Sequence, residues 1–460
     1  MFKILITKGL IIGVFVSLFS GHFSYASQTM VIKNVQVLSF AEGRFLAPSN
    51  VAIRDGKILA IQENYNLRDA IEIDATGQFL VPGLTEMHAH IPPQEITAED
   101  VKDLLFLYSS HGITTIRGML GHPSHLLLRD QLAANQVKGP RLFTSGPSFN
   151  GNSVQSVEDA KTKVKKQVGS GYDFIKIHPG LSPESFDAMA KLAQQFRLPF
   201  AGHVSASVGI LDSIKAGQAS IDHLDGVMAE LAVRSGYRGE GETGFFGAGL
   251  VEYIDPNYIA PLAKQLADSG VALVPTETLM YGFLSWQPAT IAAQKDVVKL
   301  MPEDVVKSWI DSRNAMQSSA WYSTAQIQKL LSFRRDFLTA FVAAGGIVLL
   351  GSDAPQVFNV PGDSLHEEMH LMVQAGMSPI QVLYAASKGP AGYFSQQKHF
   401  GEIVPGLSAD LVLLDKNPLI DITHTRSIVG VMTRGNWLDK AVIKGTLLEI
   451  KNKHRETLEQ

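Results

Sequence analysis

The segment that ends in His88-Ala89-His90 places two imidazole side chains at the end of a run typical of a buried strand. Because side chains alternate between the two faces of a strand, both imidazoles point the same way and can reach one point in space. Joint binding of a metal ion is the chemistry that such a pair offers. Accidental spacing is the alternative, and the rest of the chain has to decide between the two.

Four further side chains that could take part in a metal site stand within or directly after other apolar runs. They are Lys176, His203, His223 and Asp353. Singly, each has a structural explanation, since a lone histidine is commonly hydrogen-bonded and an aspartate after a strand commonly caps a helix. Lys176 is less ordinary, because a charged lysine inside an apolar strand is costly to bury. The set becomes specific only if the fold brings its members together.

Eight short apolar runs, most of them separated by helical patterns, supply the elements that would position these residues. After the run that ends at His90, they cover 112–119, 141–147, 173–178, 199–205, 220–226, 271–278 and 347–355. Eight strand–helix repeats predict an α/β fold built on a (β/α)8 TIM-like barrel. Active sites of such barrels lie at the C-terminal ends of the strands, so all six candidates are expected at one end. Residues 182–197 give a clear intervening helix that begins near Ser182.

Short β-branched runs near both ends of the chain predict a second, smaller domain. They occupy residues 30–61, 409–415, 428–438 and 440–448, and we expect them to pair into a composite β-sandwich. The predicted division is therefore a β-sandwich from 27–81 and 401–460 around a barrel of residues 82–400. A glycine-rich and then helical insertion at about 227–345 interrupts the barrel. A lid or substrate wall is one interpretation of it, and a surface elaboration or dimer contact is the other.

The first 26 residues have the layout of a secretory signal peptide. Lysines precede an apolar stretch, small residues follow, and cleavage is expected after Ala26. An uncleaved anchor helix is the alternative, but the unbroken apolar stretch is shorter than the ~20 residues that a span needs. The sequence thus predicts a secreted or periplasmic protein. The chain has no cysteine, so any metal must be held by histidine and carboxylate side chains.

Composition excludes several classes of partner. The chain has 40 basic and 44 acidic residues, a formal net charge of -4 and no basic tract, so nucleic acid is not an expected partner. No later stretch is apolar enough to anchor the mature chain in a membrane. We expect a small-molecule substrate and a homo-oligomer.

The motifs around these residues resemble those of the amidohydrolase superfamily, and within it the imidazolonepropionase-like and Xaa-Pro dipeptidase-like branch. The similar stretches are PGLTEMHAH, DFIKIH, AGHVS, IDHLDG and GSDAP, followed by the return into the small domain at 401–422. The resemblance implies two divalent metal ions, with zinc as the expected metal. It assigns His88, His90 and Asp353 to one ion, His203 and His223 to the other, and a carboxylated Lys176 as the bridging ligand.

The same resemblance implies a metal-dependent amidohydrolase that cleaves a C–N bond by metal-activated hydroxide, with Asp353 as the catalytic group that transfers the proton. A dipeptide such as Xaa-Pro or an N-acyl amino acid is the expected substrate. A cyclic amide, as for imidazolonepropionase, or a lactone or ester would suit the same chemistry. A single-metal site and a non-catalytic barrel scaffold also stay open, and the complete ligand set argues against the scaffold.

Four weaker candidates for substrate contact stand near the strand ends. His178 shares the face of Lys176, and Arg117 could bind a substrate carboxylate or form an inward salt bridge. Tyr237 and Arg238 could bind a carboxylate or polarise the scissile carbonyl, and a surface loop is the alternative there. His122 and His125 are expected as solvated residues at a helix start, and a loop edge of the pocket is the alternative. Residues expected on a solvated helix after the last strand are His366, Glu367 and Glu368.

Overall fold

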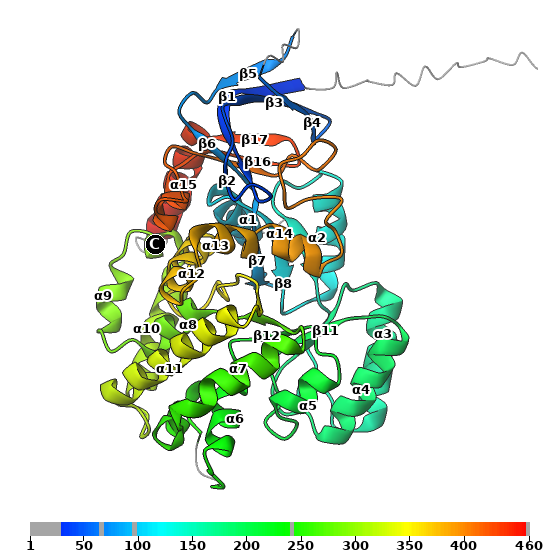
Figure 1. Ribbon diagram of the computed structural model, residues 1–460, viewed down its shortest axis with the longest axis vertical. Helices are drawn as coiled ribbons and strands as arrows, with labels where there is room; N and C mark the ends of the chain where they lie inside the picture. Colours follow the sequence, from blue (N-terminus) through cyan, green and yellow to red (C-terminus); the bar gives the residue numbers. More distant parts are fainter. Residues whose placement is uncertain (1–28, 64–68, 94–98, 240–242, 457–460) are drawn as a thin grey trace, which may run out of the picture.

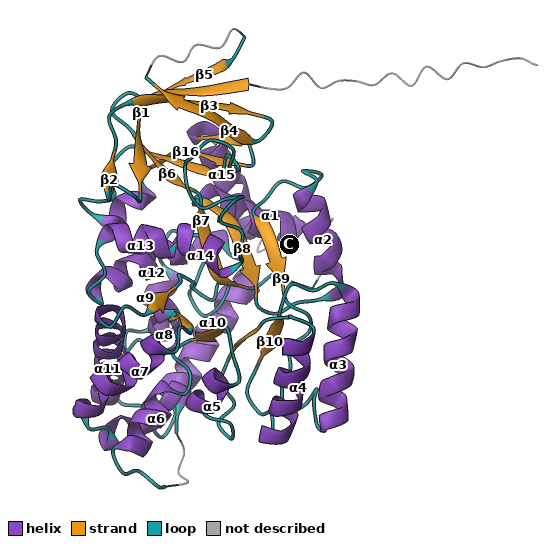
Figure 2. Cartoon of the chain, turned by 45° about the vertical axis from the view of Figure 1, so that its right-hand side comes forward, coloured by secondary structure: helices purple, strands orange, loops and turns teal. Residues whose placement is uncertain are grey.

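The computed structural model describes residues 29–63, 69–93, 99–239 and 243–456. The predicted signal peptide, residues 1–26, lies outside the described residues. A helix-covered barrel forms the larger part of the molecule, and a β domain lies at one end of its long axis (Figures 1 and 2). In the described part of the chain, no helix has both the length and the apolar character needed to cross a lipid bilayer.

The β domain is a single curled sheet whose strands come from both ends of the chain. Its main path runs β17-β16-β15-β6-β1-β3-β4, and β2 and β5 also pair with β1. In Figure 1 the N-terminal strands, in blue, lie beside the C-terminal strands, in orange and red. The strands are β1 (Thr29–Ser39), β2 (Arg44–Phe45), β3 (Ser49–Arg54), β4 (Lys57–Gln62), β5 (Ile71–Asp74), β6 (Phe79–Pro82), β15 (Leu411–Leu414), β16 (Ile428–Thr433) and β17 (Asn436–Asp439).

An apolar core joins the two halves of this sheet. Ile32 and Val51 from the N-terminal strands share one buried cluster with Leu411, Leu413 and Met432 from the C-terminal strands. The sheet must curl for side chains from both halves to meet, and runs of buried residues in β3, β15 and β16 fit strands that are covered on both faces. The composite β domain predicted from the sequence is confirmed.

The prediction of a strand at 440–448 is wrong, because these residues begin helix α15 (Lys440–Glu456). The side chain of Asp439 accepts hydrogen bonds from the backbone N–H groups of Ala441 and Val442 and so caps the helix. Ile443 and Leu447 follow each other at helical spacing and pack into the large core. The β-branched residues that suggested a strand are overridden by this cap and this packing.

The barrel is closed by eight parallel strands. They are β7 (Leu84–Ala89), β8 (Ile113–Gly118), β9 (Arg141–Thr144), β10 (Ile175–Ile177), β11 (Phe200–Gly202), β12 (Ser220–Asp222), β13 (Ala272–Val274) and β14 (Ile347–Val348). Backbone hydrogen bonds join neighbouring strands in the order β7-β8-β9 and, in a second ladder, β10-β11-β12-β13-β14. The bridges Ser145↔Phe174 and Ala89↔Ala354 close the two remaining gaps. Each predicted apolar run contains one of these strands, so the TIM-like barrel is confirmed.

Helices surround the barrel and continue into the insertion. They are α1 (Glu99–Ser110), α2 (Pro123–Ala133), α3 (Val157–Ser170), α4 (Pro183–Gln195), α5 (Ile210–Lys215), α6 (Val227–Arg234), α7 (Ile259–Asp268), α8 (Glu277–Leu284), α9 (Ala289–Ala293), α10 (Glu303–Gln317), α11 (Thr324–Ala343), α12 (Asp363–Gln374), α13 (Pro379–Ala385) and α14 (Lys388–Tyr393). The 3-10 helices are η1 (Phe245–Tyr253), η2 (Pro256–Tyr258), η3 (Val298–Leu300) and η4 (Ile422–Arg426). As predicted, Ser182 is the N-cap of α4.

Candidate metal centre

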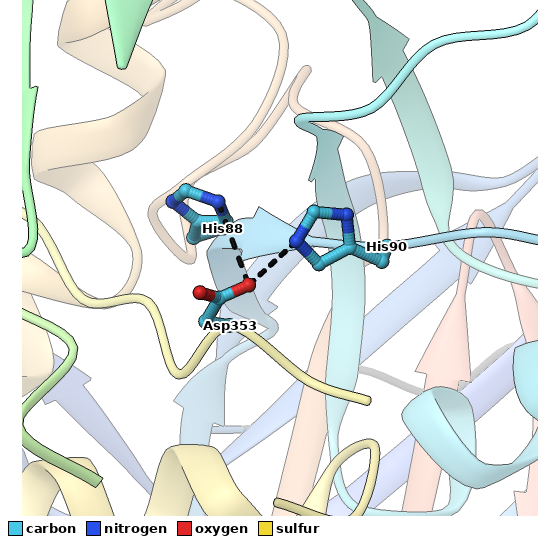
Figure 3. A group of neighbouring side chains, drawn as sticks. All are labelled: His88, His90 and Asp353. Atoms are coloured by element: carbon cyan, nitrogen blue, oxygen red, sulfur yellow. Dashed lines mark hydrogen bonds and ion pairs between the residues drawn. The ribbon is translucent and has the colours of Figure 1, made fainter. Parts of the chain in front are cut away.

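The pairing of β7 with the segment after β14 brings the first three ligand candidates together. The backbone N–H of Asp353 donates to the carbonyl of His88, and that of His90 donates to Ala354, both at 2.9 Å. This pairing places Asp353 Oδ1 2.6 Å from His90 Nε2 and 3.6 Å from His88 Nε2 (Figure 3). One ligand atom from each of the three residues lies within 4.8 Å of the others. Their spacing is suited to a shared cation.

The other three candidates continue this cluster across the barrel. Lys176 Nζ lies 3.3 Å from His88 Nε2. The ring of His223 is centred 4.5 Å from that of His88, and the ring of His203 is 4.6 Å from that of His223. All six side chains therefore form one continuous group at the C-terminal ends of the strands.

Three of the four histidines in this group have their Nδ1 atoms beside an oxygen. His203 Nδ1 lies 3.1 Å from a carboxylate oxygen of Asp225. His223 Nδ1 lies 2.7 Å from the hydroxyl of Thr276. The Nδ1 atom of His88 is 2.7 Å from Asp222 Oδ2, a short contact although its angle is not that of a hydrogen bond. Such outer partners orient imidazole ligands and leave Nε2 for a metal ion.

The donor set fits a divalent metal. Burial, together with neighbouring positive charge, lowers the pKa of His88 and of His223 well below the ordinary value, so both rings are neutral. Neutral imidazole is the form that binds metal. His90 Nδ1 is buried and has no hydrogen-bond partner among the described residues. Nitrogen and carboxylate donors of this kind suit zinc and also accept manganese, cobalt or iron.

Lys176 is fully buried in the middle of the cluster. Burial lowers the pKa of its amine to about 8, and the Asp222 and Asp353 carboxylates act in the opposite direction. A larger share of this amine is therefore neutral near pH 7 than for an exposed lysine. The neutral amine is the form that reacts with CO₂ to give a carbamate.

Arg117 lies beneath the cluster and is committed to internal contacts. Its Nη2 donates to Asp222 at 2.9 Å, and its Nη1 donates to Ser220 and Tyr393. Its Nε donates to the carbonyl of Met87. Every guanidinium nitrogen is thus used, so Arg117 forms the inward salt bridge that was one of its two sequence interpretations. Burial alone would raise the pKa of Asp222, but the charges of Arg117 and Lys176 hold it below its ordinary value.

Glu86 is a buried carboxyl that was not among the residues predicted from sequence. It accepts hydrogen bonds from the backbone N–H groups of His88 and Ser352 and from the Ser352 hydroxyl. Burial raises its pKa to about 7. Glu86 therefore fastens β7 to the segment that carries Asp353. Its position two residues before His88, on the same strand face, was a signal that could have revealed it.

The weaker candidates occupy different places. His178 stacks on His203 with ring centroids 5.0 Å apart, at the edge of the cluster. Arg238 donates to the carbonyls of Val233 and Tyr237. The ring of Tyr237 packs against Tyr253. Among the described residues, no hydrogen bond or ring contact joins Tyr237 or Arg238 to the six ligand candidates.

The solvated helix positions expected after the last strand are wrong for two residues. His366 is buried, and its ring nitrogens contact Thr425 Oγ1 and the carbonyl of His111. Glu368 is also buried, because its carboxylate accepts from the backbone N–H groups of Glu277 and Thr278.

A similar correction applies at the start of α2. His125, expected to be solvated, is buried there, whereas His122 is half-buried as the N-cap residue. His125 packs inward because its Nδ1 accepts from the backbone N–H of His122 and its Nε2 contacts the carbonyl of Pro92.

One residue of the insertion lies directly against the cluster. The ring of Phe246, in η1, is centred 5.4 Å from His223 and 6.2 Å from His203. Its backbone has φ of 50°, a left-handed conformation that is unusual for a bulky residue. Gln326 of α11 donates to the carbonyl of Ala248 and holds this turn in place. Phe246 therefore forms an apolar wall beside the second pair of histidines.

The fold defines a TIM-barrel protein, and the cluster at the strand ends is compatible with a metal ion. Residues 79–448 match the amidohydrolase family, and the chain belongs to that family. Ochratoxinase from Aspergillus niger is 22% identical over 285 residues, which are 58% of this chain and 46% of that protein. The chain spans less than half the length of the first curated relatives that it matches.

Solved structures share the architecture over almost the whole chain. Bottromycin amidohydrolase superposes with a TM-score of 0.74 at 21% identity and covers 93% of this chain and 90% of its own. A Xaa-Pro dipeptidase with bound methionine in its active site superposes with a TM-score of 0.63 at 18% identity, over 90% and 100% of the two chains. At these identities the likeness establishes the fold.

We expect Asp222→Asn to destabilise the protein by about 3–5 kcal/mol, because Arg117 would keep a buried charge without its counterion. Urea denaturation measures this loss. Asp268→Asn, in an exposed pair with Lys264, is the control and should cost less than about 1 kcal/mol. Equal effects of the two substitutions would contradict the role given to the Arg117–Asp222 pair.

Proposed function

We propose that this protein is a metal-dependent hydrolase that cleaves the amide C–N bond of a dipeptide, such as Xaa-Pro, or of an N-acyl amino acid. The observation that carries the proposal is the gathering of His88, His90, His203, His223, Lys176 and Asp353 into one group. Amide hydrolysis needs a strong nucleophile near neutral pH and a group that returns a proton to the leaving nitrogen. This set of side chains can hold metal ions that activate water as the nucleophile, and its Asp353 can transfer the proton.

Each residue has a role in the proposal. His88, His90 and Asp353 would hold one divalent ion, and His203 and His223 would hold a second. Lys176, carboxylated on Nζ, would bridge them as an anionic ligand. When bound, such ions make water nucleophilic at neutral pH and polarise the carbonyl under attack. Asp353 would accept a proton from the attacking water and deliver it to the leaving nitrogen.

The substrate class is supported by the neighbours and by the wall at Phe246. One structural neighbour is a Xaa-Pro dipeptidase, and one relative is an ochratoxinase. An aromatic ring beside His203 and His223 favours a substrate with an apolar group on that side. Dipeptides and N-acyl amino acids with apolar side chains combine such a group with a scissile amide.

Export belongs to the same proposal. The layout of residues 1–26 and the absence of cysteine suit a protein that works outside the cytoplasm. Peptide-like substrates are available in such a compartment.

Lys176→Met and His203→Ala should each lower turnover by more than about 100-fold, because each removes a proposed metal ligand. Loss of a residue that only orients a ligand typically costs about 10–100-fold. Turnover would be measured with zinc-loaded protein on a library of dipeptides and N-acyl amino acids, and bound zinc by elemental analysis. His370→Ala, at a half-buried histidine that contacts Gln374, is the control and should retain both turnover and bound zinc. Near-normal turnover in either ligand variant would exclude the two-metal arrangement.

Phe246→Ala should lower, about tenfold, the ratio of kcat/KM for a substrate with an apolar side chain to kcat/KM for its glycine counterpart. The apolar substrate would lose its contact beside His223. The comparison of kcat/KM for matched substrate pairs measures this change. Tyr258→Ala, an exposed aromatic residue in η2, is the control. An unchanged ratio would show that the apolar side chain of the substrate does not contact Phe246.

The mature N-terminus is expected directly after Ala26. Expression of the full sequence in a bacterium, followed by fractionation and mass spectrometry of the N-terminal peptide, tests this expectation. Full-length protein confined to the cytoplasm would contradict export.

A further inference from the structure

Arg334 is a fully buried arginine that connects the insertion to the metal centre. It lies on α11, and its Nη1 donates to the carbonyl of His223 at 2.8 Å. Its Nη2 donates to the carbonyl of Pro275 and, at 2.6 Å, to Glu277. Its Nε donates to the same carboxylate. One guanidinium thus joins the end of β12 to the turn between β13 and α8.

Both segments that Arg334 joins have strained backbones. His223 has φ of 64°, Leu224 has φ of 52° and Thr276 has φ of 51°. Residues other than glycine hold left-handed conformations at a cost, and they persist where surrounding contacts fix them. The two segments meet at the contact between His223 Nδ1 and the Thr276 hydroxyl. The direction of His223 Nε2 therefore depends on how the two segments are held.

We propose that Arg334 is a positioning residue for His223. By holding the His223 carbonyl and the Pro275–Glu277 turn in one arrangement, it keeps the Thr276 hydroxyl against Nδ1 and directs Nε2 into the ligand group. The inference rests on the proposed metal centre, and it gives the insertion a role there: α11 supplies the support of a ligand that belongs to the barrel.

Arg313 provides a control within the same insertion. It is also a buried arginine of the insertion, on α10, and its Nε donates to the carbonyl of Gly282. Its guanidinium stacks over Phe358. Within the described part of the chain, no hydrogen bond or ring contact joins Arg313 to the ligand group. Replacing Arg313 thus removes a buried guanidinium of the insertion, with its one hydrogen bond and one ring contact, without touching His223.

The test must separate positioning from general stability. Arg334→Gln alone would leave the Glu277 carboxylate without its counterion and close to the buried Glu368. The double variant Arg334→Gln/Glu277→Gln removes both charges together and is the better choice if the single variant does not fold. Near-UV circular dichroism and thermal melting identify the folded variants.

Equilibrium dialysis with zinc and the visible absorption spectrum of the cobalt(II)-loaded protein report the ligands directly, without substrate. We expect the double variant to bind its more weakly held metal ion about 10–100-fold less tightly than wild type and to show an altered cobalt spectrum. Arg313→Gln should keep the wild-type affinity and spectrum. Thr276→Val should reproduce the loss, because it removes the hydroxyl beside Nδ1.

Wild-type metal affinity and spectrum in a folded double variant would overturn the proposal. The same loss of metal in Arg313→Gln would also overturn it, since the effect would then follow from loosened packing. Failure of wild-type protein to bind zinc or cobalt would instead contradict the proposed function itself.

Discussion

The site depends on how the barrel closes. The strand β7 and the segment after β14 are far apart in sequence, yet backbone hydrogen bonds between His88 and Asp353 and between His90 and Ala354 join them. Glu86 reinforces this pairing through its hydrogen bonds with Ser352. Without the pairing of the two segments, Asp353 would have no fixed position relative to His88 and His90. Closure of the barrel and assembly of the proposed metal centre are therefore one structural event.

A group of polar side chains inside a barrel requires a second layer of partners. Buried groups lose hydration, and they remain in place when each is neutral or hydrogen-bonded. Here the Nδ1 atoms of three of the histidines face Asp222, Asp225 and Thr276. Arg117 bonds to Asp222, and Arg334 holds the turn that carries Thr276. This second layer comes from barrel strands and from the insertion alike. The orientation of the ligands is thus distributed over distant parts of the chain.

Much of the architecture could be predicted from local sequence. The eight apolar runs each contain a barrel strand, and Ser182 caps the helix that follows it. The exception at 440–448 shows the limit of this reasoning, since Asp439 and the packing of Ile443 and Leu447 made a helix of a segment whose composition suggested a strand. The expectation of solvated positions also failed for His366 and Glu368, because their partners, Thr425 and the Glu277–Thr278 backbone, lie far away in sequence.

By itself, the sequence determined the types of the six side chains and their places at strand ends, because strand periodicity and the order of strands and helices are local properties. Tertiary structure decided which side chains support them. The role of Arg117 is decided by Asp222 and Ser220 beside it, and Arg334 gave no signal, since its partners lie far away in sequence. A long-range hydrogen bond has no spacing that could reveal it, and its partners are known only once the chain has closed around them.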